Sequence, residues 1–222
     1  NDIVEPYASI KTTLVISKKI IEYLKFRPRN IVDVVFWPQR HLHLKQQVII
    51  AEHLNNNKIK YKFVTDKRII YKKLKSKGQP TSMLDWLPYD SSKKSYFSLI
   101  ESTTKIILSD IKGINESHKK IIINILQNNF FRLKKCVKDT NIVLKYYNPK
   151  LVFLGNDLLL DGSTIAQRLK INEITSASIM HGNLTTALHK NHVVDKFFTF
   201  GKKDKNSLMD LGLKKDKVIV SG

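Results

Sequence analysis

The stretch IVDVVFWPQRHLHLKQQVIIAEHLNNNKIKYKFVT, residues 31–65, carries the clearest pattern of secondary structure in the sequence. It opens with an apolar run rich in Val, residues 31–37, which ends at Pro38 and is typical of a buried strand. Apolar residues then recur at spacings of four, three and three, the period of an amphipathic helix, at Leu44, Val48, Ala51 and Leu54. A second strand is expected at residues 61–65. The stretch is therefore a βαβ unit, in which a right-handed crossover joins parallel strands.

The same alternation returns in the last third of the chain. Strands are expected at residues 151–154, 175–180, 196–200 and 218–220, with helices at residues 163–169 and 204–211. Between the two parts we expect a short helix before Gly78, an irregular segment at residues 83–89, and long helices at residues 96–111 and after Gly113. The sequence predicts an α/β fold with a doubly wound, mostly parallel, Rossmann-like sheet and long additional helices, in a single domain spanning residues 1–222.

The amino-acid composition limits the classes of protein to which this chain can belong. Hydrophobic residues make up 42% of the 222 residues, enough for a core, and Cys136 is expected to be a small core residue. No apolar run approaches the roughly 20 residues of a membrane span, so we expect a cytoplasmic protein. The chain starts at Asn1 and ends on a strand-like stretch, as expected of a piece of something longer.

The charge is strongly positive. Thirty-nine Lys and Arg against 19 Asp and Glu give +20, which favours anionic partners. The lysines are spread along the chain, however, as on a solvated surface. We therefore do not expect nucleic acid as a partner, whereas the inner face of an anionic membrane is an expected peripheral contact.

Ligands of an open parallel sheet bind at the carboxyl ends of the strands. Three loops follow such ends, at residues 37–43, 155–161 and 181–185. In the first loop, cationic and hydrogen-bonding groups suit a phosphate or carboxylate on a substrate, and they are Arg40, His41 and His43. No further His or Cys stands at a ligand-like spacing from these histidines, so no metal site is expected.

The other two loops offer candidates for chemistry. Asp157 follows its strand closely, where a carboxylate could accept the proton of an attacking hydroxyl, but a structural turn with Asn156 fits the sequence as well. His181 could bind an oxyanion or move a proton, and Gly182 lets the backbone approach a ligand. A histidine that only caps a strand end is the alternative.

Several enzyme classes lose their support. The eight glycines form no GxGxxG and no GxxxxGK[ST] motif, which disfavours dinucleotide oxidoreductases and P-loop enzymes. There is also no GxSxG elbow, which disfavours an α/β-hydrolase.

Residues 149–222 resemble a known family. The strings PKLVFLGND at residues 149–157, ITSASIMHG at residues 174–182, DKFFTFG at residues 195–201 and LGLKKDKVIVSG at residues 211–222 look like the second half of the amino-terminal domain of GT-B glycosyltransferases. Similar patterns occur in bacterial capsule and surface-polysaccharide glycosyltransferases, CDP-glycerol glycerophosphotransferases and UDP-GlcNAc 2-epimerases. Met180 stands where the family usually has Gln before His-Gly.

The resemblance implies a function. It implies transfer of a sugar from a nucleotide-sugar donor to a glycan or lipid-linked acceptor in surface polysaccharide biosynthesis, with no cofactor beyond the nucleotide-sugar substrate. Asp157 and His181 would be catalytic, and the substrate-binding residues would be Arg40, His41, His43, Asn156, Gly182 and Asn183. The carboxyl-terminal donor domain would be missing, so this piece alone is expected to be inactive. A nucleotide-sugar epimerase and a non-catalytic polyanion-binding module are the alternatives.

Overall fold

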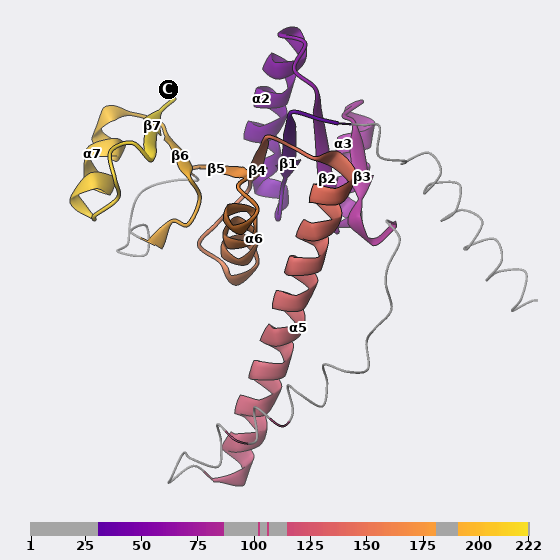
Figure 1. The fold of residues 1–222 in the computed structure, drawn as a ribbon, viewed down its shortest axis with the longest axis vertical. Coiled ribbons are helices and arrows are strands. Elements are labelled where there is room, and N and C mark those ends of the chain that lie inside the picture. Colours follow the sequence, from indigo (N-terminus) through magenta and orange to yellow (C-terminus); the bar gives the residue numbers. More distant parts are fainter. Residues whose placement is uncertain (1–30, 87–101, 103–105, 107–114, 181–190, 222) are drawn as a thin grey trace, which may run out of the picture.

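The computed structural model describes residues 31–86, 102, 106, 115–180 and 191–221, and its core is one sheet with helices on both faces (Figure 1). The strands are β1 (Val34–Trp37), β2 (Tyr61–Thr65), β3 (Thr81–Met83), β4 (Leu151–Leu154), β5 (Thr175–Ile179), β6 (Lys196–Thr199) and β7 (Val218–Val220). The helices are α2 (Leu44–Asn56), α3 (Arg68–Ser76), α5 (Glu116–Tyr147), α6 (Leu160–Ile171) and α7 (Lys202–Asp210), with short 3-10 helices η1 (His41–His43) and η2 (Leu84–Trp86).

The seven strands lie in the order β3-β2-β1-β4-β5-β6-β7, and every neighbouring pair is parallel. The chain first winds outward from β1 to β3. It then returns along α5 to β4, on the other side of β1, and continues to β7. This order confirms the predicted doubly wound α/β fold, and it makes β1 and β4 neighbours at the point where the winding reverses.

Both faces of the sheet are buried. Side chains of β1 alternate between them, so that Val34 and Phe36 pack with α2 and α3, whereas Val35 and Trp37 pack with α5 and α6. A sheet buried on both faces needs apolar residues at consecutive positions. This explains why the strands appear in the sequence as continuous apolar runs.

A row of phenylalanines fixes the register of the central strands. Phe36 stacks on Phe63 with 4.9 Å between ring centroids, and it meets Phe153 at 5.7 Å. Phe153 reaches Phe198 at 5.8 Å, across β5, where the small side chain of Ala177 leaves room. Slipping one strand by a single residue would turn its ring to the opposite face, so the row selects one pairing.

The long helix α5 packs mainly through its second half. All of its buried residues follow position 135, and its first half projects beyond the sheet (Figure 1). Cys136 is one of the buried residues, which confirms it as part of the core. Burial, aided by nearby carboxylates, raises the pKa of its thiol to about 12.

Two sequence expectations differ from the structure. The segment after Gly78 contains the short strand β3, which the sequence analysis missed because three residues are too few to show a period. The stretch expected as a loop at residues 37–43 contains the 3-10 helix η1, which holds His41 and His43 and leads into α2. The helix expected at residues 96–111 falls outside the described residues, apart from positions 102 and 106.

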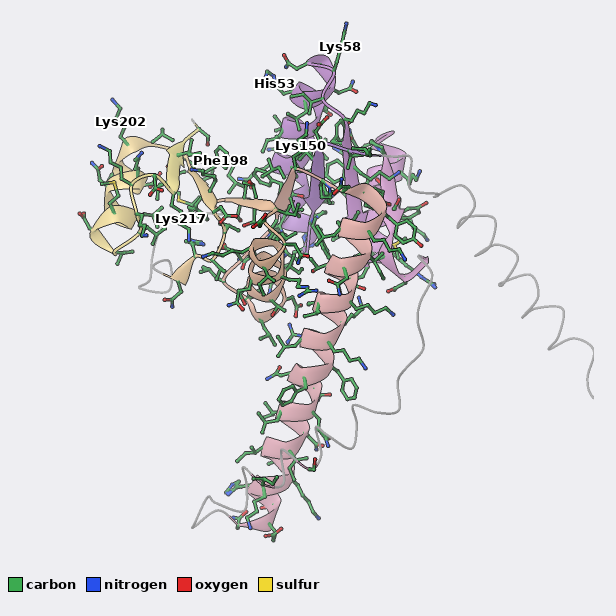
Figure 2. All side chains as sticks on the ribbon, viewed as in Figure 1. His53, Lys58, Lys150, Phe198, Lys202 and Lys217 are labelled. Atoms are coloured by element: carbon green, nitrogen blue, oxygen red, sulfur yellow. The ribbon has the colours of Figure 1, made fainter. Side chains whose placement is uncertain are left out.

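In the described part of the chain, lysines lie around the periphery and do not form one stripe. Lys58 and Lys150 precede β2 and β4 at the amino edge of the sheet, whereas Lys202 begins α7 (Figure 2). No helix within the described ranges has both the length and the apolar character that crossing a membrane requires.

Candidate functional site

The carboxyl ends of β1 and β4 lie side by side. The strand register pairs Trp37 with Leu154, the last residue of each strand, so the loops that follow start next to each other. The chain then leaves in opposite directions, through α2 towards β2 and through α6 towards β5. Parallel α/β sheets bind ligands at such a switch point.

Two adjoining clefts open at this point. The first, which we call the basic cleft, has a volume of about 310 Å³, and its polar lining includes Arg40, His43, Lys67, Arg132, Asn156 and Asp161. The second, the mixed cleft, has a volume of about 330 Å³, and its charged lining is Asp66, Lys67, Arg132, Lys135, Asp139 and Asp161. Both volumes suit a sugar-sized or phosphate-sized group.

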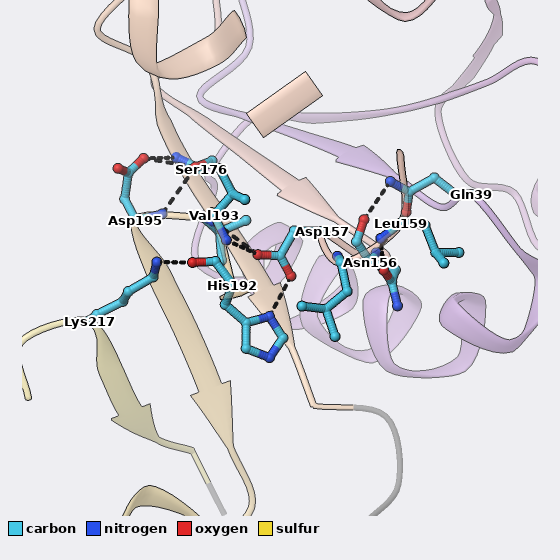
Figure 3. A network of polar contacts seen from close by, with 11 residues as sticks. Gln39, Asn156, Asp157, Leu159, Ser176, His192, Val193, Asp195 and Lys217 are labelled. Carbon is cyan, nitrogen blue, oxygen red and sulfur yellow. Dashed lines mark hydrogen bonds and ion pairs between the residues drawn. The ribbon is translucent and has the colours of Figure 1, made fainter. Parts of the chain in front are cut away.

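The side-chain amide of Gln39 ties the two loops together. It accepts a hydrogen bond from the backbone N–H of Asn156 at 2.7 Å and donates one to the carbonyl of the same residue at 2.9 Å (Figure 3). The side chain of Asn156 in turn accepts from the N–H groups of Leu158 and Leu159 at 2.9 and 3.1 Å. Asn156 therefore forms the turn that the sequence analysis held open as an alternative, and it also lines the basic cleft.

Two glycines allow this close packing. A Cβ atom on Gly155 would lie 1.9 Å from Nδ1 of His43, and one on Gly162 would lie 1.7 Å from the carbonyl oxygen of Asn156. Both distances are far below any real contact. Gly155 therefore lets the His43 ring pack against the loop, and Gly162 lets the first turn of α6 approach the same loop.

The three predicted substrate-binding residues of the first loop do not all lie at the same cleft. Arg40 is exposed, and its backbone N–H donates to Nδ1 of the buried His43 at 3.3 Å. Both residues line the basic cleft together with Asn156. His41 is exposed and instead lines a small pocket of about 50 Å³ between α2 and α3. Of the three predicted binding residues in this loop, two meet at the cleft and one does not.

Asp157 is almost fully buried, with 1% of its surface exposed. One carboxylate oxygen lies 2.7 Å from Nδ1 of His192, and the other accepts the backbone N–H groups of Val193 and Val194 at 2.7 and 3.0 Å (Figure 3). The His192 ring also packs on Phe197, with 3.7 Å between the centroids. Asp157 thus anchors the non-helical segment directly before β6.

This environment controls the protonation of Asp157. Burial alone would raise its pKa, but the hydrogen bond and charge interaction with His192 and the two backbone N–H groups outweigh it, so the pKa is lowered. A general base for an acceptor hydroxyl needs contact with that hydroxyl and a pKa near the working pH. In this structure Asp157 lines neither cleft, and its carboxylate oxygens contact His192 and the segment before β6. The catalytic role of Asp157 stays a prediction.

Lys217 also contacts this segment. Its ammonium group donates to the carbonyl oxygen of His192 (Figure 3). Burial lowers the pKa of Lys217, although Asp157 and Asp195 act in the opposite direction. Asp195 also accepts from the N–H and hydroxyl groups of Ser176 at 2.8 Å each, so the segment before β6 is held at both of its ends.

An ion network lines the mixed cleft. Lys135 lies 2.8 Å from Asp139 and 3.0 Å from Asp66. Burial raises the pKa of Asp139, and the Lys135 ammonium acts against that rise. Sequence reasoning did not select these residues. Asp66 directly follows β2 and could have been noticed, but Lys135 is one of many lysines on a long helix and carries no sequence signal.

The third predicted loop lies outside the described residues, and with it His181, Gly182 and Asn183. Within the described ranges, no group of three or more His, Cys, Asp or Glu side chains could hold a metal ion. This region also contains residues that no sequence pattern singled out, namely Gln39, Lys67, Arg132 and His192. The role of His192 depends on a contact with Asp157 across 35 positions, which no local pattern reveals.

No protein-family model matches the sequence, and no curated protein matches it either. Two solved glycosyltransferase structures align with TM-scores below 0.5. A glycosyltransferase from Rickettsia africae ESF-5 has a TM-score of 0.46 and 13% identity, covering 86% of this chain and 42% of that one. The lipopolysaccharide outer core galactosyltransferase WaaB in its apo form has a TM-score of 0.48 and 13% identity, covering 84% and 44%.

The structure of S. aureus MnaA with UDP aligns with a TM-score of 0.51 and 12% identity, covering 85% of this chain and 44% of that one. This chain therefore spans less than half the length of each of these solved structures. At this identity the likeness concerns the fold alone. The chain is similar in fold to S. aureus MnaA over 85% of its length, and both have a Rossmann-like α/β arrangement.

Proposed function

We propose that this chain is the acceptor-side half of a GT-B glycosyltransferase. It would transfer a sugar from a nucleotide-sugar donor to a glycan or lipid-linked acceptor during surface polysaccharide biosynthesis. The observation that supports this proposal best is the pair of polar clefts at the switch point between β1 and β4. The fold shared with MnaA, a protein solved with UDP, is compatible with a nucleotide-bearing donor.

In the proposed reaction, an oxygen of the acceptor hydroxyl bonds to the anomeric carbon of the donor sugar. The bond from that carbon to the nucleotide phosphate oxygen breaks, and the nucleotide leaves. We assign the hydroxyl proton to His181, with Gly182 and Asn183 as neighbouring binding groups, because these residues begin two positions after the end of β5 in the sequence. The transfer would need no cofactor.

Residues of the basic cleft would bind the acceptor. Arg40, His43 and Asn156 line the basic cleft, where they would contact polar groups of the acceptor. Asp157 would act indirectly, by holding His192 and the segment before β6. We place the reaction in the cytoplasm at the inner membrane face, where lipid-linked acceptors are found and where a net charge of +20 would favour anionic lipids.

The test uses the natural protein at its full length. We would incubate it with a panel of nucleotide-sugars, with and without membrane-extracted glycan acceptors, and detect nucleotide release by mass spectrometry. Release that needs both donor and acceptor is the expected result. Sugar conversion without acceptor would instead favour an epimerase, and no turnover in any mixture would leave a binding module as the better explanation.

Variants in one loop test the proposed base. We expect H181A to lower kcat by about 10²–10⁴-fold, the usual contribution of a general base. The matched control is H189A, a histidine eight positions later in the same stretch, which should leave kcat within about twofold of the parent. Equal losses in both variants would remove the assignment of His181.

A further inference from the structure

The two clefts at the switch point differ in charge. The basic cleft is lined by Arg40, Lys67 and Arg132 against one carboxylate, Asp161, so three positive charges and one negative charge give +2. The mixed cleft is lined by three positive and three negative side chains, which sum to zero. Since the clefts adjoin and share Lys67, Arg132 and Asp161, the excess positive charge lies on the Arg40 side.

Lys135, the cation that lines only the mixed cleft, is engaged within the protein. It lies 2.8 Å from Asp139, which is buried, and 3.0 Å from Asp66. The cations that line both clefts are held more loosely. Lys67 lies 3.4 Å from Asp66, with side chains 59% and 26% exposed. Arg132 meets Asp161 at 3.0 Å in a pair whose side chains are 54% and 40% exposed, and such exposed pairs exchange partners easily.

Arg40 is an exposed residue of this cleft. Its side chain forms no ion pair with any residue that the structure describes, and the residue is exposed beside the cleft. The first turn of α6 borders the same cleft through Leu159, Asp161 and Gly162, so the positive end of the helix dipole lies nearby. Guanidinium forks of this kind match the paired oxygens of a phosphate.

We propose that the basic cleft binds a phosphate group of the acceptor, held between Arg40 and Arg132 with Lys67 nearby. This inference rests on the proposed function, because it specifies which acceptors the transferase would accept. A phosphate carries up to two negative charges, which the excess of positive charge in the cleft lining attracts. Arg132 exchanges its contact with Asp161 for a phosphate oxygen when the acceptor binds.

Inorganic phosphate is the first probe. The affinity is measured from side-chain Nε–Hε signals of arginine in NMR titrations, at constant ionic strength set with chloride. Replacing either arginine, in R40Q or R132Q, should weaken binding roughly tenfold, because each change removes a charge-assisted hydrogen bond. Replacing the competing carboxylate, in D161N, should tighten binding severalfold. This gain cannot be produced by a variant that merely fails to fold.

The chain offers a matched control at the opposite edge of the sheet. A pocket at the amino ends of the strands is lined by Lys58, Lys60 and Lys62 against Glu52, and it too sums to +2. Lys58 projects from the far end of α2 (Figure 2). K58Q should therefore leave phosphate affinity unchanged. An equal loss in K58Q and R40Q would show general attraction to a basic protein and would overturn the proposal.

Two organic probes distinguish the sources of the phosphate. The first is a hexose 1-phosphate compared with the free hexose, and the second is a short polyprenyl phosphate in micelles compared with the polyprenol. Binding of either phosphate that is lost in R40Q supports the proposal and identifies the source. If none of the three phosphates binds, or if the phosphate-free partners bind as well, the proposal is wrong.

Failure of this inference can be told apart from failure of the proposed function. If the full-length protein transfers sugar equally well to phosphate-free acceptors, and R40Q does not change KM, the transferase remains and the phosphate site is wrong. If phosphate binds as described but no donor and acceptor pair gives turnover, the site remains and the transferase is wrong.

Discussion

Replacing Asp157 with Asn tests the buried contacts that hold the segment before β6. The carboxylate accepts three hydrogen bonds, at 2.7 Å from His192 and at 2.7 and 3.0 Å from the N–H groups of Val193 and Val194. Asn keeps the shape, but it removes the charge and turns one acceptor into a donor. Bonds to a charged group contribute about 1.5–3 kcal/mol, against about 1 kcal/mol for neutral ones.

The expected loss follows from this count. Two bonds weaken by about 1 kcal/mol each. The third depends on His192, which must offer a lone pair at Nδ1 to the new amide or lose the contact altogether. We therefore expect D157N to lower the free energy of unfolding by about 3 kcal/mol, out of a typical total of about 5–15 kcal/mol.

Urea unfolding followed by circular dichroism at pH 7 measures this loss. The control is D210N, which changes an exposed carboxylate at the end of α7 and should stay within about 0.5 kcal/mol of the parent. A D157N midpoint that coincides with the D210N midpoint, at the same slope, would refute the anchoring role.

The pH dependence gives a second check on the same residue. Because the folded-state pKa of Asp157 is lowered, its stabilisation is fully present above the unfolded value of about 3.9 and is lost as the pH falls through the folded value. The difference in stability between parent and D157N should therefore shrink on going from pH 7 to pH 3. A difference that stayed constant would contradict the charged state assigned to Asp157.

Three further results are expected. G162A should lower the unfolding free energy by about 1–3 kcal/mol, because its Cβ would lie 1.7 Å from a backbone oxygen, whereas G201A, whose Cβ would meet only a side-chain oxygen at 3.9 Å, should change it little in the same urea assay. K135Q should lower the unfolding free energy by about 1–2 kcal/mol at pH 7 and by less at pH 4, because burial raises the pKa of Asp139 and this carboxylate loses its charge in acid. Thermal melts at both pH values would measure the two losses, and equal losses would contradict the reasoning. The thiol of Cys136, with its pKa raised to about 12, should react with a disulfide reagent at pH 8 only after urea is added, and prompt reaction of the folded protein would contradict its burial.

The sequence predicted the fold better than the site. Consecutive apolar residues in β1 and β4 and the helical period of α2 are local signals, and they survive in the structure. β3 is too short to carry such a signal. The contacts of Asp157 depend on residues 35 to 37 positions away, which only the folded chain brings together. A carboxylate after a strand therefore looked like a catalytic group, although its surroundings are those of an anchor.

In the loop after β4, the residues that stabilise the fold differ from the residues that would bind a ligand. Gln39 holds it on the β1 side, Asp157 ties it to the segment before β6, and Gly162 lets α6 pack directly against it. Substitutions in a loop that is fixed on three sides are expected to lower the free energy of unfolding. Arg40 and Arg132 line the same cleft but are exposed, so they can change at little cost to folding. Substitutions of the two arginines should therefore alter which acceptors bind while the loop stays constant. Replacing Arg40 or Arg132 should change ligand affinity without moving the urea midpoint.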